Sequence, residues 1–138
     1  EVLRYSIKKD TNGKYKVKQE TRLRDVRDVK WASNTCVMEW GTEGIWPQGA
    51  ASDDINSVCT SPDNNVVVSA DDHGHVNMFN YPCITSGASA NVGKGHSSHV
   101  MNVRFSHGKG AKVKTENTNI FSVGGNDRAL FMWKLKKV

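Results

Sequence analysis

The chain has 138 residues, of which 37% are hydrophobic and 24% are charged, a composition typical of one folded domain that excludes a largely disordered protein. No run approaches the roughly 18 apolar residues of a membrane span, and the segment EVLRYSIKKD lacks the apolar core of a signal peptide, so we expect a cytosolic protein without membrane partners. The net charge of +5 is segregated: residues 1–30 carry ten Lys/Arg against five Asp/Glu, residues 31–103 one against seven, and residues 104–138 eight against two, which favours an acidic partner, although a solvated face explains it equally well.

All of the predicted elements are β-strands. Short runs rich in β-branched and aromatic residues recur between turn residues such as Asp10–Gly13 and Ser61–Asn64, and no stretch has a helical period of apolar residues. The fold class is therefore predicted to be all-β. The expected strands are, in chain order, residues 1–8, 14–20, 35–40, 55–60, 65–70, 75–80, 100–106, 119–124 and 129–135.

Residues 55–79 and 99–133 read as two copies of one unit. Each runs strand, loop, strand ending near Ser, tight turn, strand ending in an aromatic residue. The unit resembles the WD40 repeat, in which a Gly-His pair opens a four-stranded blade and a Trp-Asp pair closes it. Gly95-His96 opens the last copy, Trp133-Lys134 closes it, and Asp127 stands at the turn position. This resemblance implies that His96 is a structural residue, hydrogen-bonded to the aspartate and the tryptophan.

Both copies depart from the repeat pattern. In the first, His73 takes the aspartate position and Phe79 the tryptophan position; in the last, Val123 stands where a Ser or Thr would complete the hydrogen-bonded set. We therefore expect this hydrogen bonding to be incomplete in both blades, which would depend more on apolar packing.

Histidines, serines and carboxylates that suggest chemistry have simpler explanations. His73 and His75 form half of a metal site at most, since only Asp71 and Asp72 stand near them, and adjacent carboxylates in a turn are normally solvated. Ser97 and Ser98 beside His96 and His99 lack the GxSxG elbow of a hydrolase, and Gly93-Lys94-Gly95 lacks the strand-to-helix context of a phosphate loop. We predict no catalytic, cofactor-binding or metal-binding residues, no small-molecule substrate and no enzyme activity.

A long basic loop, residues 108–119, carries Lys109, Lys112 and Lys114. These lysines could contact nucleic acid, but no aromatic residues stand between them to stack on bases. A surface insertion is the expectation, and nucleic acid is not an expected partner.

Tryptophans and cysteines are the residues most expected in the interior. Trp31, Trp40 and Trp46 lie within 16 residues and are predicted to pack in the core or between blades, with an exposed binding patch as the alternative. Cys36, Cys59 and Cys83 form no CxxC pair, so buried, reduced thiols are expected.

Particular stretches of the chain resemble the last blades of the echinoderm microtubule-associated protein-like family. The resemblance runs from about residue 25 to residue 135, and His73 and the insertion at 108–119 depart from it. The matching stretches are Asp28-Val29-Lys30-Trp31-Ala32, Thr35-Cys36-Val37, Gly44-Ile45-Trp46-Pro47, Asp54-Ile55-Asn56, Asp71-Asp72, Gly74, Val76, Phe79, Tyr81-Pro82-Cys83 and Gly95 to Val100.

The resemblance implies a partial β-propeller of WD40-type blades, and the chain is expected to be a fragment of a larger tandem propeller. Residues 1–9 would be the closing strand of a preceding blade, 10–50 a connecting segment with an outer strand, 51–81 a WD40-like blade and 82–138 the final blade. It further implies a non-enzymatic microtubule-associated protein of the cytoplasm and cytoskeleton, or of the ciliary axoneme, that binds tubulin and also other proteins through its propeller faces. The alternative is a general WD40 scaffold without direct microtubule contact. No residue-level tubulin site follows from the matching stretches.

Overall fold

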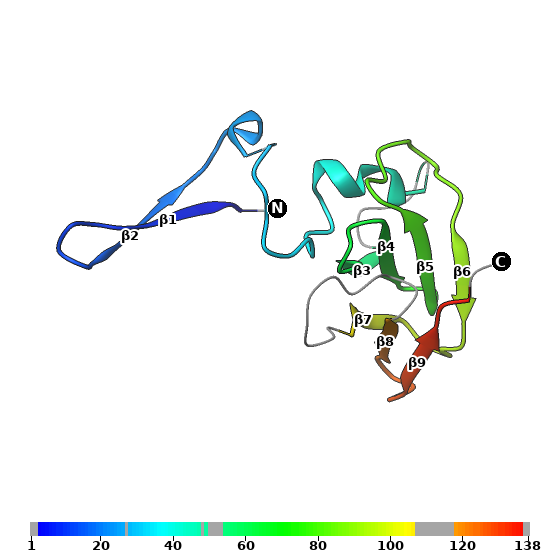
Figure 1. The fold of residues 1–138 in the computed structure, drawn as a ribbon. Helices are drawn as coiled ribbons and strands as arrows, with labels where there is room; N and C mark the ends of the chain where they lie inside the picture. The colour runs from blue at the N-terminus through cyan, green and yellow to red at the C-terminus, as the bar shows by residue number, and fades with distance from the viewer. Residues whose placement is uncertain (1–2, 27, 48, 50–53, 107–117, 137–138) are drawn as a thin grey trace. The chain divides into compact units, whose positions relative to one another are not determined.

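The computed structural model describes residues 3–26, 28–47, 49, 54–106 and 118–136 (Figure 1). The chain divides into two compact units, residues 1–32 and 33–138. Every strand pairing in the described ranges is antiparallel, and their helical segments are the two short 3-10 helices η1 (Leu23–Asp25) and η2 (Trp40–Ile45). The all-β prediction is confirmed. No helix in these ranges is long and apolar enough to cross a membrane.

The first unit is built on a β-hairpin. Strand β1 (Tyr5–Lys9) pairs with β2 (Tyr15–Gln19) over five residues each, in the register that places Ile7 opposite Val17. Asp10 holds the turn between them, because its carboxylate accepts hydrogen bonds from the backbone N–H groups of Asn12 (3.0 Å) and Lys14 (2.9 Å). The strand expected to close a preceding blade (residues 1–9) and the outer strand expected within residues 10–50 therefore pair with each other.

The second unit contains two sheets. The first sheet has the order β3 (Ile55–Thr60), β4 (Val66–Asp71), β5 (His75–Asn80), β6 (Asn91–Lys94), the four-stranded blade of a propeller. Strand β6 is not predicted from the sequence, since NVGK is short and contains a glycine. It lies within the range 82–138 expected for the final blade, yet it pairs with β5 and completes the preceding one.

The second sheet repeats the first with three strands, β7 (Val100–Phe105), β8 (Asn119–Gly124) and β9 (Leu130–Lys134). Each sheet has a register shift near the start of its first strand, after Ile55 in the one and after Val100 in the other. The registers therefore superpose residue by residue, so that Ser69 corresponds to Ser122 and Phe79 to Trp133.

The core lies on both faces of the first sheet. On one face, Val68, Ala70 and Val76 pack against Val100 and Val103 of the second sheet, whose strand β7 lies beside β3 and β4. On the other face, a second cluster brings η2 and the segment around Cys83 onto the sheet; its buried members are Ile45, Ile55, Val58, Val67, Phe79 and Cys83.

The segment before the first sheet differs from the prediction. Residues 35–40, expected to be a strand, do not form one: residues 35–39 are irregular and Trp40 begins η2. The reason is that side chains rather than a neighbouring strand bind its backbone: the carbonyl of Val37 accepts the Trp46 indole N–H at 3.0 Å and lies 3.3 Å from the Thr42 hydroxyl.

The tryptophan prediction is correct for one residue of three. Trp46 is half-buried and packs against the second cluster, whereas Trp31 is 45% exposed and Trp40 is 58% exposed. Trp40 is the first residue of η2, and the buried positions of that helix are Gly41, Thr42, Gly44 and Ile45, which leaves position 40 at the surface.

Candidate functional site

Buried polar side chains form a connected network in the second sheet. His96 lies in the segment that leads into β7, and its Nδ1 is 2.8 Å from a carboxylate oxygen of Asp127 in the β8–β9 turn. Its Nε2 is 2.8 Å from the hydroxyl of Ser122 on β8, and the same hydroxyl accepts the indole N–H of Trp133 on β9 at 2.8 Å. The network joins the entry segment, two strands and the turn between them.

Hydrogen-bond roles in this network follow from its two ends. The Asp127 carboxylate can only accept, so Nδ1 of His96 carries a proton, and in the neutral ring Nε2 accepts from the Ser122 hydroxyl. The pKa of Asp127 lies below the ordinary aspartate range, chiefly because the backbone N–H of Ala129 donates to it, with His96 and the Ser97 N–H contributing.

This network corrects one expectation from the sequence. Val123 is exposed, and the position that completes the hydrogen-bonded set is its neighbour Ser122, which is 1% exposed. The β8–β9 turn contains one residue more than the β4–β5 turn. An alignment that matches Asp127 with His73 is therefore wrong by one position on the strand before the turn. Hydrogen bonding in the final blade is complete.

The triad of Ser122, His96 and Asp127 nevertheless cannot perform hydrolysis. The side chain of His96 has no exposed surface, and Ser122 is buried with its hydroxyl bonded to the indole N–H of Trp133. A nucleophile must reach its substrate. The geometry is that of a structural link, which is the role expected of His96.

The first sheet uses a different arrangement at the same place. In the second sheet, Gly124 must lack a side chain because the Asp127 carboxylate and the His96 ring occupy the space of its Cβ. The residue of matching register in the first sheet is Asp71, whose carboxylate accepts the N–H groups of His73 (2.9 Å) and His75 (2.8 Å) and the side-chain amide of Asn77 (2.9 Å). Asp71 therefore organises its own turn.

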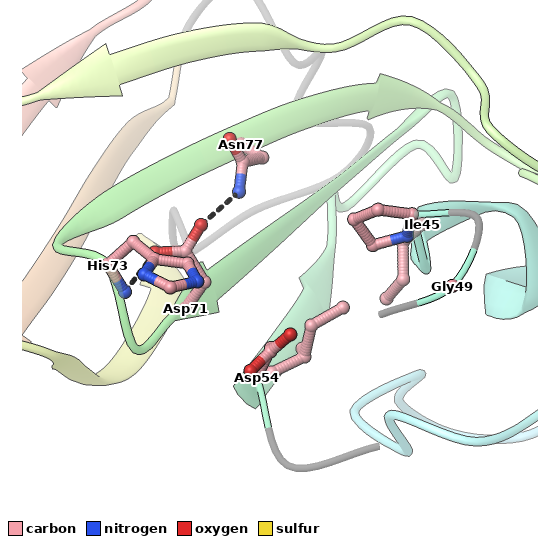
Figure 2. A pocket seen from close by; sticks show the side chains of 8 residues that line it. Ile45, Gly49, Asp54, Asp71, His73 and Asn77 are labelled. Atoms are coloured by element: carbon pink, nitrogen blue, oxygen red, sulfur yellow. Dashed lines mark hydrogen bonds between the residues drawn. The ribbon is translucent and has the colours of Figure 1, made fainter. Parts of the chain in front are cut away.

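A cavity of about 300 Å³ lies beside this turn, and Asp54, Asp71, His73 and Asn77 are its polar lining residues (Figure 2). Figure 2 shows the Asp71 carboxylate bonded to Asn77 and to the His73 backbone rather than left open to a ligand. Among the described residues no group of three or more His, Cys, Asp or Glu side chains is arranged to hold a metal ion. Both oxygens of the Asp71 carboxylate already accept hydrogen bonds, so Asp71 is not free to bind a cation in this cavity.

The remaining residues singled out from the sequence are not brought together into a reactive site. His73 and His75 have ring centroids 6.4 Å apart, and His75 lies 3.3 Å from the Asp71 carboxylate. The Ser98 hydroxyl is 3.1 Å from Nδ1 of His99, its neighbour in sequence. Lys109, Lys112 and Lys114 lie outside the described residues.

The cysteine prediction of buried, reduced thiols agrees with the structure at two positions of three. All three cysteines are free, and Cys59 and Cys83 are buried, whereas Cys36 is half-buried. Burial raises the pKa of the Cys83 thiol, which keeps it protonated and a poor nucleophile at neutral pH.

Polar side chains also link the two sheets where β3 lies beside β7. The amide of Asn56 donates to the Val100 carbonyl at 3.1 Å. The guanidinium of Arg104 donates to the Ser57 hydroxyl at 2.7 Å and lies 3.3 Å from the Val58 carbonyl. The sequence shows no sign of this link, because it joins residues more than 40 positions apart through side chains that each read as ordinary surface residues.

Comparison with known proteins places this architecture in one family. The family model described as "Echinoderm microtubule-associated protein second beta-propeller" matches residues 10–135. Over 118 residues the chain is 42% identical to echinoderm microtubule-associated protein-like 2 of Rattus norvegicus. Over the same length it is 38% identical to echinoderm microtubule-associated protein-like 3 of Homo sapiens and 35% identical to echinoderm microtubule-associated protein-like 1 of Mus musculus. Each match covers 86% of this chain but only 17%, 12% and 14% of the relative, respectively.

The chain thus spans less than a fifth of the relatives it matches. Its repeated antiparallel sheets and the His96–Ser122–Trp133 network agree with a propeller assignment. The chain belongs to the echinoderm microtubule-associated protein-like family, in the region of the second β-propeller.

Proposed function

We propose that this chain is part of a non-enzymatic WD40-repeat protein that binds tubulin or microtubules and acts as a platform on the cytoskeleton, in the cytoplasm or the ciliary axoneme. The observation that carries the proposal is the match to relatives whose names describe microtubule association, which extends over 86% of the chain at 35–42% identity.

Charge supports the same partner. The basic segments at residues 1–30 and 104–138 would be attracted to the acidic surface of tubulin, and such attraction weakens as salt rises. Propeller proteins bind through faces and loop edges, so we expect the binding energy to be spread over many residues.

The test is co-sedimentation of the chain with polymerised microtubules over a salt series from about 50 to about 300 mM, where screening changes strongly. We expect pelleting that depends on the polymer and decreases as salt increases. The chain centrifuged without polymer is the control for self-association. Absence of polymer-dependent pelleting at the lowest salt would contradict direct binding.

A second candidate function is a general scaffold that recruits other proteins without direct microtubule contact. It draws on the same family match, which names microtubule association without placing a contact on any residue of this chain. Microtubule pelleting that occurs only when a cell extract is added would favour this candidate.

A further inference from the structure

The β1–β2 hairpin has two chemically distinct faces. Cross-strand register places Ile7 beside Val17 and Lys9 beside Tyr15 on one face, on which Tyr5 also lies. These apolar side chains are 49–68% exposed. The other face presents Lys8 opposite Lys16 and Ser6 opposite Lys18.

Charge on the hairpin is strongly positive. Residues 3–25 contain eight Lys/Arg and three Asp/Glu. On the basic face Lys18 has an ion pair with Glu20 at 3.4 Å, and the Ser6 hydroxyl donates to the same carboxylate at 2.8 Å. Glu20 is thereby engaged at one end of the face, where, besides the Ser6 hydrogen bond, the positive charge of Lys8 also helps to lower its pKa.

The centre of the basic face is the pair Lys8 and Lys16. They are direct cross-strand partners, which places their Cβ atoms about 5 Å apart on one face, and like charges in that arrangement repel. Both side chains are exposed, and neither has a salt bridge within the described residues. A carboxylate bound between the two ammonium groups would replace this repulsion with two attractions.

We propose that the basic face of the hairpin, defined by Lys8, Lys16 and Lys18, is a docking surface for an acidic peptide segment rich in carboxylate side chains. The face is about 15 Å long, since five strand residues each advance about 3.3 Å, so a segment of five to eight residues covers it. This inference rests on the proposed function for the identity of the partner protein, whereas the chemistry of the peptide rests on the hairpin alone.

The first test measures binding of a fluorescently labelled octaglutamate peptide to the whole 138-residue chain by anisotropy at about 50 mM salt. The double variant Lys8→Gln/Lys16→Gln should bind about five-fold more weakly, because each exposed ion pair contributes modestly. The matched control Lys94→Gln/Lys134→Gln removes the same charge from exposed positions on β6 and β9 and should bind as the parent chain does. Equal weakening by both variants, or no binding by the parent, would overturn the proposal.

Two further measurements separate the explanations that remain. The variant Lys8→Arg/Lys16→Arg keeps the charge and should retain binding; loss of binding would overturn a charge-based surface. A single-stranded oligonucleotide of equal charge that binds at least as tightly would overturn the choice of peptide over nucleic acid.

Microtubule pelleting of the same variants distinguishes this inference from the proposed function. Octaglutamate binding that depends on Lys8 and Lys16 without any pelleting would leave the hairpin surface standing and reject the proposed function. Pelleting in the absence of octaglutamate binding would do the reverse.

Discussion

Replacement of Ser122 by alanine tests whether the buried network stabilises the final blade. Ser122→Ala removes the hydroxyl that accepts the Trp133 indole N–H and donates to His96, both at 2.8 Å. Two polar groups lose their partner in a buried site, and each unsatisfied group costs about 1–3 kcal/mol. We expect a loss of about 3 kcal/mol in the free energy of unfolding, equivalent to about 12 °C in Tm for a protein of this size.

The repeat supplies a matched control for this prediction. Ser69 occupies the corresponding position in the first sheet and is equally buried, but its hydroxyl has no hydrogen-bond partner among the described residues. Ser69→Ala is therefore expected to be neutral or to stabilise by up to about 1 kcal/mol, because it removes an unpaired buried hydroxyl. The assay is urea unfolding of both variants and the parent chain, followed by circular dichroism. Losses of equal size in the two variants would refute the reasoning, because the chemical change is the same and only the network differs.

Two other predictions concern the turn aspartate and the helix η2. The pKa of Asp127 is lowered in the folded chain, so its stabilising contribution is present above the ordinary aspartate pKa of about 4 and is lost as pH falls through the lower folded value. Asp127→Asn should therefore have a lower urea midpoint than the parent chain at pH 7, and its midpoint should change less as the pH falls. Midpoints of the two chains that fall in parallel below about pH 4 would count against this. Gly44→Ala should destabilise by about 2 kcal/mol, because the added Cβ meets the Thr85 carbonyl oxygen, and the exposed neighbour Glu43→Ala serves as the control in the same thermal scan. A Tm unchanged from that control would show that the segment yields to the methyl group.

Much of the fold could be predicted from the sequence because its strands follow strong local signals. The runs INSVCT, HVNMFN and NIFSVG are bounded by turn residues and are rich in residues that suit a pleated sheet, and the structure has strands at those same bounds. The strand expected at 35–40 is wrong because the hydroxyl of Thr42 and the indole of Trp46 engage its backbone carbonyls. β-Propensity does not take account of side chains that compete for the backbone carbonyls of a strand.

The site was harder to predict than the strands. The WD40 resemblance singles out His96, Asp127 and Trp133 by their spacing. In the structure His96 contacts Asp127 directly and is linked to Trp133 through the hydroxyl of Ser122. Ser122 was missed because its selection depends on the length of a turn, one residue longer than in the first sheet, and strand register is fixed only once that turn is formed.

The register shift near the start of each sheet places one extra residue there, and the two extra residues differ in chemistry. In the first sheet the extra residue is Asn56, whose amide bridges to the Val100 carbonyl and to the Asp72 carboxylate. In the second sheet the extra residue is Met101, which is 51% exposed and whose side chain has no N–H or O–H group to donate. The two sheets share the backbone register shift, but within the described part of the chain the second sheet has no counterpart of the hydrogen bonds made by the Asn56 amide. At this position a molecule bound to the second sheet would meet the Met101 thioether instead of an amide donor, so contact there would be apolar.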